Sequence, residues 1–181
     1  MKWKLKESKK VFEANIFSLE QLDFIDTSNH KPLPHPFYRI NSPDWVNVLP
    51  ITTENEVILV RQPRAGVVRP TLEIPGGLVD PGEEPIVAAK RELEEETGYA
   101  GGTFTHLGSI PPNPAIQNNI LHMFVATGVT VEANRNHFPD TTESIDLVTV
   151  SLNELEQLVA KCEINSALAS LTIMLALKKP I

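Results

Sequence analysis

The sequence contains a single cysteine, Cys162, among its 181 residues. No disulfide can therefore form within the chain, and a chain of this length buries enough apolar surface to fold without one. A lone cysteine is typical of a reducing compartment, so a cytoplasmic location is expected. The basic start, MKWKLKESKK, has no apolar run behind it and is not expected to act as a secretory signal.

Long hydrophobic runs are also missing. The longest, residues 167–177, is too short to cross a bilayer and contains Ser170 and Thr172, so it predicts a buried C-terminal helix and no membrane span. The formal net charge of −7 argues against binding to nucleic acid or to an anionic membrane. Internal repeats and low-complexity tracts are absent, which indicates one globular domain with at most an appended segment.

The order of local patterns predicts a mostly β chain with one central helix. Pro85 suits the first turn of a helix and Gly98 its end, so a helix is expected over residues 85–97, after a Gly/Pro loop. This order favours an α/β or α+β sandwich over a Rossmann repeat. The other expected elements are β pieces at 11–17, 37–40, 46–52, 56–61, from 71, 103–110, 120–132 and 145–151, and helices at 152–162 and 165–179.

The negative charge is concentrated in one short window. Between Asp80 and Glu96 lie seven acidic residues, against only Lys90 and Arg91, so this window has a net charge of −5. The rest of the chain is nearly neutral. Such a window is typical of a cation-binding centre, and also of an ordinary acidic helix surface exposed to solvent.

Three carboxylates of the expected helix converge on one face. Glu92, Glu95 and Glu96 stand at i, i+3 and i+4, whereas Glu94 lies about 200° around the helix from Glu92 and is expected to point to water. Neighbouring like charges repel unless a cation neutralises them. Oxygen-only ligands select hard ions such as Mg²⁺, with Mn²⁺ next, and no cluster of Cys and His competes for zinc.

The spacing around this helix resembles the Nudix box. Gly77 is followed after five residues by Glu83, after seven more by the run RELEEE, and then by Gly98 and Tyr99, a fixed pattern over 23 residues. Tyr99 departs from the aliphatic residue that is usual there. The resemblance implies an α/β/α sandwich with a mixed sheet, formed by residues 46–181, and hydrolysis of a nucleoside diphosphate linked to another group. A small β segment, residues 1–45, precedes it.

The resemblance also implies roles for individual residues. Arg91 is expected to orient and neutralise the carboxylates, and Glu83 to support the arrangement of loop and helix. The implied metal ligands are Glu92, Glu95, Glu96 and the carbonyl of Gly76, with Glu96 also part of the catalytic set. Metal ions that bridge two phosphates neutralise developing charge and activate water for attack on phosphorus.

Segments outside the box resemble ADP-ribose pyrophosphatases and related nucleoside-diphosphate-sugar hydrolases. Pro114, fifteen residues beyond Tyr99, lies in a partial match to their PSPG segment, in which Ala115 replaces a glycine. Asn119 stands where a glutamate is common, so any role of that glutamate is lacking here. Pro114 is therefore expected to contact the substrate, and the alternative is a rigid loop without a role in specificity.

The run RQPR resembles the Gln-x-Arg of the same hydrolases. Gln62 and Arg64 are accordingly expected to face the substrate, with Arg64 pairing to its phosphates. A surface salt bridge is the alternative for Arg64. Glu73, in the lead-in TLEIPGG, is expected to give polar support to the site.

The resemblance places a general base in the loop DTTESIDLVTV. Glu143 is the expected base and Asp140 the second candidate, whereas either one could equally be a solvated loop acid. An aromatic residue of the N-terminal segment is expected to stack on the nucleotide base. Phe37 is the first candidate, with Tyr38 and Trp45 as alternatives, although such rings often belong to the core.

The resemblance further implies a homodimer built through the N-terminal segment. Three functions remain open at this point. The first is a Mg²⁺-dependent pyrophosphatase acting on ADP-ribose or a related nucleoside diphosphate sugar, and the second is the same chemistry on GDP-mannose or a dinucleotide. The third is a module that binds ADP-ribose without cleaving it, which the complete set of box carboxylates disfavours.

Overall fold

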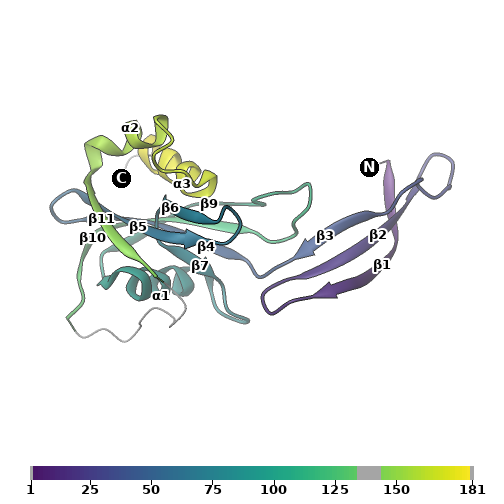
Figure 1. The fold of residues 1–181 in the computed structure, drawn as a ribbon, viewed down its shortest axis with the longest axis horizontal. Helices are drawn as coiled ribbons and strands as arrows, with labels where there is room; N and C mark the ends of the chain where they lie inside the picture. Colours follow the sequence, from purple (N-terminus) through teal and green to yellow (C-terminus); the bar gives the residue numbers. More distant parts are fainter. Residues whose placement is uncertain (1, 134–143, 180–181) are drawn as a thin grey trace. The chain divides into compact units, whose positions relative to one another are not determined.

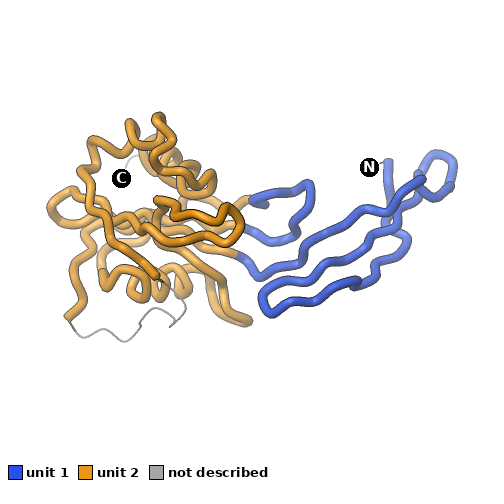
Figure 2. The backbone as a smooth tube through the Cα atoms, in the orientation of Figure 1, with its two compact units in different colours: residues 1–44, 111–120 blue, residues 45–110, 121–181 orange. Residues whose placement is uncertain are grey.

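The computed structural model describes residues 2–133 and 144–179, and the chain divides into two compact units (Figure 2). The first unit comprises residues 1–44 and 111–120, and the second comprises residues 45–110 and 121–181. Each unit has its own β-sheet. The sequence did not predict that residues 111–120 belong to the first unit.

The first unit contains a three-stranded antiparallel sheet with the order β1-β2-β3 (Figure 1). Its strands are β1 (Trp3–Glu13), β2 (Ser18–Asp26) and β3 (Phe37–Asn41). The strand expected at 37–40 is confirmed. The piece expected at 11–17 is confirmed only for residues 11–13, which end β1, because Ala14 N–H donates to Phe17 O in the turn that follows. Every residue of β1 is exposed, and two register shifts interrupt its alternation, which hid most of the strand from a pattern search.

The second unit is built on a mixed sheet with the order β11-β5-β4-β10-β8, in which β4 and β10 pair in parallel (Figure 1). In addition, β6 pairs with β5, β7 with β4, and β9 with β10. The expected mixed sheet is confirmed, although the segment that forms β7 was expected to be loop. The strands are β4 (Trp45–Thr52), β5 (Glu56–Arg64), β6 (Arg69–Glu73), β7 (Gly76–Leu78), β8 (Tyr99–Ala100), β9 (Thr103–Ile110), β10 (Leu121–Val131) and β11 (Asp146–Ser151).

Helices cover both faces of this sheet, as an α/β/α sandwich requires. Helix α1 (Pro85–Thr97) packs through Leu93 onto one face, against Val48 and Phe124. Helices α2 (Leu155–Ala160) and α3 (Ala167–Lys178) pack onto the other face, where Met123 and Ile173 are fully buried. Alternate residues of β10 therefore serve two cores. The helix expected at 152–162 is divided into η1 (Leu152–Glu154) and α2.

Local signals set the bounds of α1 as predicted. Pro85 occupies the first turn, and Gly98, at φ 72°, donates its N–H to the carbonyl of Glu94. The buried stripe consists of Ala88, Ala89 and Leu93, whereas Ile86 is 36% exposed. Within the described ranges, no helix has both the length and the apolar character to span a membrane.

Candidate active site

Two glycines of β7 bring this strand against α1 and β4. A Cβ at Gly77 would overlap the carboxylate of Glu92, and a Cβ at Gly76 would overlap the carbonyl of Val46 and crowd Asn47. At Gly76 the obstacle is backbone, so only a residue without a side chain fits there, whereas at Gly77 a side chain would displace the Glu92 carboxylate. The two glycines thus let the backbone of β7 lie beside the acidic face of α1.

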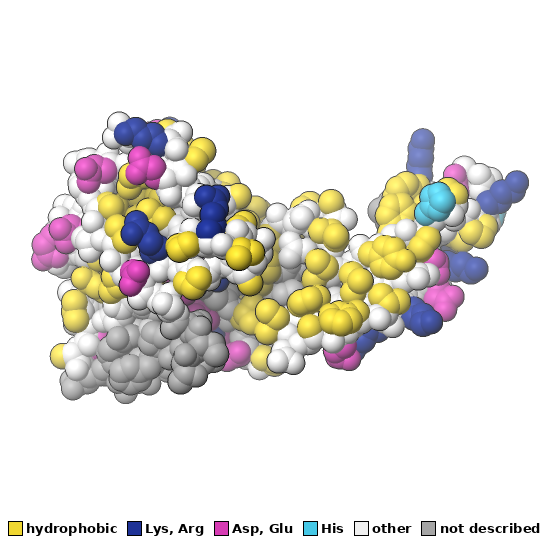
Figure 3. All heavy atoms as spheres, viewed as in Figure 1, with side chains coloured by type: hydrophobic (Ala, Val, Ile, Leu, Met, Phe, Trp, Pro, Cys, Tyr) yellow, Lys and Arg dark blue, Asp and Glu magenta, His cyan; other side chains and the backbone are white. Residues whose placement is uncertain are grey.

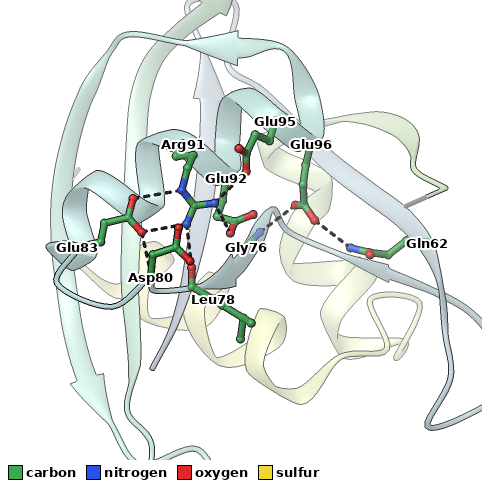
Figure 4. A network of polar contacts seen from close by, with 9 residues as sticks. All are labelled: Gln62, Gly76, Leu78, Asp80, Glu83, Arg91, Glu92, Glu95 and Glu96. Carbon is green, nitrogen blue, oxygen red and sulfur yellow. Dashed lines mark hydrogen bonds and ion pairs between the residues drawn. The ribbon is translucent and has the colours of Figure 1, made fainter. Parts of the chain in front are cut away.

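Arg91 lies at the centre of the acidic face (Figure 4). Its Nη1 donates to Glu92 at 2.8 Å and to Glu95 at 2.9 Å, while its Nε and Nη2 donate to Glu83 at 3.1 and 3.0 Å. Nη2 also donates to the carbonyl of Leu78 at 2.9 Å. The guanidinium thus joins the loop before α1, strand β7 and two carboxylates of the helix. Glu83, followed by Glu92 and Glu95, raises the pKa of Arg91 above its ordinary value.

Glu83 fixes the loop that leads into α1. Besides the two bonds from Arg91, its carboxylate accepts the backbone N–H of Asp80 at 3.1 Å (Figure 4). The side chain is largely buried, so these bonds form away from bulk solvent. The structure therefore brings Glu83 and Arg91 together as a support for the carboxylates of the helix.

Glu96 occupies a separate, buried position. Its two oxygens accept from the backbone N–H of Gly76 at 2.9 Å and from the Gln62 side chain at 3.2 Å (Figure 4). Burial raises the pKa of Glu96 to about 8, and the negative charge of Glu92 adds to this, outweighing the two hydrogen bonds and the charge of Arg64. Sequence reasoning did not foresee the contact between Gln62 and Glu96, because β5 and α1 are distant along the chain.

The expectation that Glu94 points to water is wrong. Only 9% of this residue is exposed. On this side of α1, Glu94 lines a cavity together with residues 100–102 and Phe104 of β9. Helical spacing placed Glu94 opposite Glu92 correctly, but it gave no information on what covers that side.

Among the described residues, no group of three or more acidic, His or Cys side chains is arranged to hold a metal ion. Arg91 engages Glu92 and Glu95, whereas Gly76 and Gln62 hold Glu96. The donor set nevertheless fits a divalent cation. Its ligands are oxygens only, and the three carboxylates of this face outnumber the single guanidinium of Arg91 that two of them contact. Mg²⁺ needs only one or two carboxylates, completed by water and phosphate, so a closed protein cage is not required.

Arg64 is paired within the protein. Its Nε and Nη2 donate to the two carboxylate oxygens of Glu73 at 2.9 and 3.2 Å, and Thr71 donates to the same carboxylate at 2.5 Å. Burial alone would raise the pKa of Glu73, but these donors outweigh it and lower the pKa. The Arg64 side chain is 44% exposed, so one edge of the pair is open to solvent.

The remaining expected substrate contacts belong to the first unit, apart from Trp45. Phe37 packs against Trp3 and Phe24, with ring centroids 5.0 and 5.5 Å apart, and is 39% exposed. Pro114 lies in residues 111–120 of the same unit. Trp45, at the start of β4, packs against the core of the second unit. The roles of Phe37 and Pro114 in substrate binding stay predictions.

The expected general base lies outside the described residues. Both Glu143 and Asp140 fall within residues 134–143. Their roles therefore stay predictions that rest on the sequence.

Comparison with known proteins bears on both family and fold. The family described as NUDIX domain matches residues 42–168. An ADP-ribose pyrophosphatase of Bacillus subtilis is 32% identical over 165 residues, which cover 89% of this chain and 88% of that protein. A methanol dehydrogenase activator of Bacillus methanolicus is 33% identical over 153 residues, covering 84% of this chain and 80% of the relative.

A solved structure extends the likeness over both units. The crystal structure of an ADP compounds hydrolase matches with a TM-score of 0.83 and 24% sequence identity, covering 98% of this chain and 94% of that one. At this identity the match is evidence of the fold. It agrees with the α/β/α sandwich described above.

Proposed function

The chain belongs to the NUDIX family of hydrolases, and from this premise we propose that it hydrolyses the phosphoanhydride bond of ADP-ribose or a related nucleoside diphosphate sugar. The products are a nucleoside monophosphate and a sugar phosphate. The observation that carries the proposal is the complete acidic face of α1, with Glu92 and Glu95 on Arg91 and Glu96 buried beside Gly76. The named activity of the Bacillus subtilis relative supports ADP-ribose as the substrate.

A divalent metal belongs to the chemistry of this family, and we propose Mg²⁺, with Mn²⁺ as a substitute. The residues that would hold it are Glu92, Glu95, Glu96 and the carbonyl of Gly76. When bound, such an ion neutralises charge on the diphosphate and lowers the pKa of a bound water. The hard oxygen donors of this chain suit Mg²⁺ better than softer metals.

The protein's own groups position these carboxylates. Arg91 holds Glu92 and Glu95 near each other although their charges repel, and Glu83 holds the guanidinium in place. The Gly76 N–H and the Gln62 amide fix both oxygens of Glu96. Carboxylates held by such fixed bonds need little reorganisation during the reaction.

Arg64 is suited to bind the diphosphate by exchanging partners. In the structure its guanidinium makes two parallel bonds with Glu73, and a phosphate offers the same two-oxygen geometry. Gln62 lies on the same strand, two residues away, and reaches Glu96. In this proposal Phe37 stacks on the nucleotide base and Pro114 shapes the substrate site.

The reaction also needs a base that accepts a proton from the attacking water. We assign this role to Glu143, with Asp140 as the second candidate, because α1 already commits its carboxylates to Arg91 and to Gly76. The sequence around Glu143 supports the assignment. A carboxylate is a group that can accept a proton from the attacking water.

We further propose that two copies of the chain form a dimer through the first unit. All of β1 is exposed, and Trp3, Leu5, Phe12 and Phe37 each expose between 39 and 54% of their surface. Hydrophobic side chains gather over the strands of this unit (Figure 3). A contiguous apolar surface of this kind is typical of a protein–protein contact.

Product analysis tests the proposed reaction. The chain is incubated with Mg²⁺ and with ADP-ribose, ADP-glucose, GDP-mannose or a dinucleotide, and the products are separated by chromatography. AMP and ribose 5-phosphate, formed by the wild type and not by Glu96→Gln, would support the proposal. Preferred cleavage of GDP-mannose or of a dinucleotide would make that compound the assigned substrate. Binding of ADP-ribose without any cleavage would identify a binding module in place of an enzyme.

A further inference from the structure

Three polar side chains of β9 and β10 converge outside the proposed active site. His106 and Ser109 lie on β9, and His122 lies on β10. The Ser109 hydroxyl oxygen is 2.9 Å from Nε2 of His106 and 2.8 Å from Nδ1 of His122. One nitrogen of each imidazole is therefore directed toward the same oxygen atom.

A β-bulge brings these residues onto one face of the sheet. In a regular strand His106 and Ser109 would point to opposite faces, because side chains alternate. The pairing of β9 with β10 shifts by one residue between His106 and Gly108, so Leu107 is the extra residue of a bulge. Beyond the shift, Ser109 stands opposite His122. The bulge thus adds Ser109 to the face that carries the two histidines.

Neighbouring groups orient the two rings. His106 packs against Phe124 of β10, with ring centroids 5.2 Å apart, and Phe124 itself is buried in the core beneath α1. The bonds with Ser109 hold a second point of each ring. His106 and Ser109 are exposed and His122 is partly buried, so a solute can reach the cluster. Side chains that are already oriented lose less freedom when they bind a ligand.

The hydroxyl group of Ser109 cannot donate to both rings at once. It has one proton, so it donates to one imidazole while the other imidazole donates its own N–H to the oxygen. Water offers the same hydrogen bonds to groups near the surface, and the net gain from such a network is small. A ligand that binds both nitrogens directly can therefore replace the hydroxyl at little cost.

We propose that His106 and His122 together bind a divalent transition-metal ion such as Zn²⁺, Ni²⁺ or Cu²⁺. Imidazole nitrogens suit these ions, whereas Mg²⁺ prefers oxygen ligands. A metal–nitrogen bond is about 2.0–2.1 Å long, so an ion near the position of the Ser109 oxygen requires each ring to approach by less than about 1 Å. Ser109 makes room by turning to another rotamer. Water completes the coordination.

This site differs in chemistry from the acidic face of α1. It offers nitrogen donors from two strands, and it uses none of the residues proposed to hold Mg²⁺. The two sites are therefore distinguished by the kind of ion that each selects. Binding at the histidine pair does not depend on the proposed hydrolysis and is measured without substrate.

Metal binding is tested by NMR on the full-length, ¹⁵N-labelled chain. Zn²⁺ is added stepwise in an excess of Mg²⁺, which competes for oxygen ligands, and the ring nitrogens of the histidines are followed. The expected result is a saturable shift of Nε2 of His106 and of Nδ1 of His122, along the same titration curve because both report one ion. Mg²⁺ alone should leave both signals in place.

Variants then locate the site. His106→Gln and His122→Gln should each weaken Zn²⁺ binding at the remaining ring about tenfold or more, because one of two nitrogen ligands is lost. His106 is exposed, so its replacement should leave the amide spectrum of the fold intact. His35→Gln, at an exposed histidine of the first unit, is the matched control and should bind as the wild type does. The proposal is overturned if Zn²⁺ leaves either ring unchanged, if the two rings saturate at different concentrations, or if His106→Gln binds as tightly as the wild type.

Discussion

Arg91 binds different parts of the site through separate nitrogens of its guanidinium. Its bonds to Glu83, Glu92, Glu95 and Leu78 leave from three nitrogens in a fixed plane, and a lysine ammonium cannot reach all of these partners from one point. Arg91→Lys should therefore lower kcat/KM about 100-fold through misplaced carboxylates. The measurement is steady-state hydrolysis of ADP-ribose, with Arg69→Lys, at an exposed position of β6, as the control. Full activity of Arg91→Lys would contradict the positioning role.

Glu96 makes the stability of the metal-free protein depend on pH. Its pKa in the folded protein, about 8, lies above the ordinary 4.5, so the folded state retains a proton that the unfolded state has lost. The contribution of Glu96 to the free energy of unfolding therefore falls as pH rises from 4.5 to 8. Glu96→Gln cannot titrate, so its free energy of unfolding should not decrease with pH in this way. In chelator above pH 8 it should be more stable than wild type by on the order of 2 kcal/mol, about 4–8 °C in Tm.

Thermal unfolding of both proteins across this pH range checks the prediction for Glu96. The glutamine amide fits the site because the Gln62 side chain can turn to accept its N–H, while Gly76 still donates to its carbonyl. Glu84→Gln, at an exposed acid, should follow the wild type at every pH. A constant difference between wild type and Glu96→Gln across the pH range would show that Glu96 does not titrate there.

At the scale of single elements, the sequence predicted what local chemistry determines. The bounds of α1 follow from Pro85 and Gly98, and its acidic face follows from helical spacing. What the sequence could not supply are contacts between distant segments. The burial of Glu94, which lines a cavity with Phe104 of β9, is one example, and the bond between Gln62 of β5 and Glu96 of α1 is another. Most of strand β1, residues 3–10, was missed because bulges and exposure on both sides remove the alternation that marks a strand.

The approach of β7 to α1 depends on Gly77. Gly77→Ala would place a methyl group into the carboxylate of Glu92, so this side chain must move and give up its bond with Arg91. We expect a loss of about 1–3 kcal/mol in the free energy of unfolding, measured by urea denaturation, together with a fall in hydrolysis. Gly66→Ala is the matched control, since a Cβ there meets nothing within 4 Å. Equal stability of the two variants would show that the Glu92 carboxylate can move without cost.

At the scale of the whole molecule, the proposed metal should stabilise one unit selectively. Trp3 lies in the first unit and Trp45 in the second, and the sequence has no other tryptophan. In Trp3→Phe, fluorescence therefore reports on the second unit. Mg²⁺ at about 100 times its Kd should add about 2.7 kcal/mol to the stability of that unit by binding only its native state. This gain in stability should vanish with chelator and in Glu92→Gln. If it persisted in Glu92→Gln, the metal would bind elsewhere.

The proposed dimer through the apolar surface of the first unit can be tested by measuring the molecular mass in solution by sedimentation. A chain of 20.1 kDa should sediment at twice that mass if two copies cover each other's exposed strands. Leu5→Lys puts a charge on this surface at a side chain that is already 43% exposed, so the chain should still fold but sediment as a monomer. Val131→Lys makes the same change at a 69% exposed site in the second unit and should leave the dimer intact. A wild type that sediments as a monomer, or a dimer that survives Leu5→Lys, would exclude this interface.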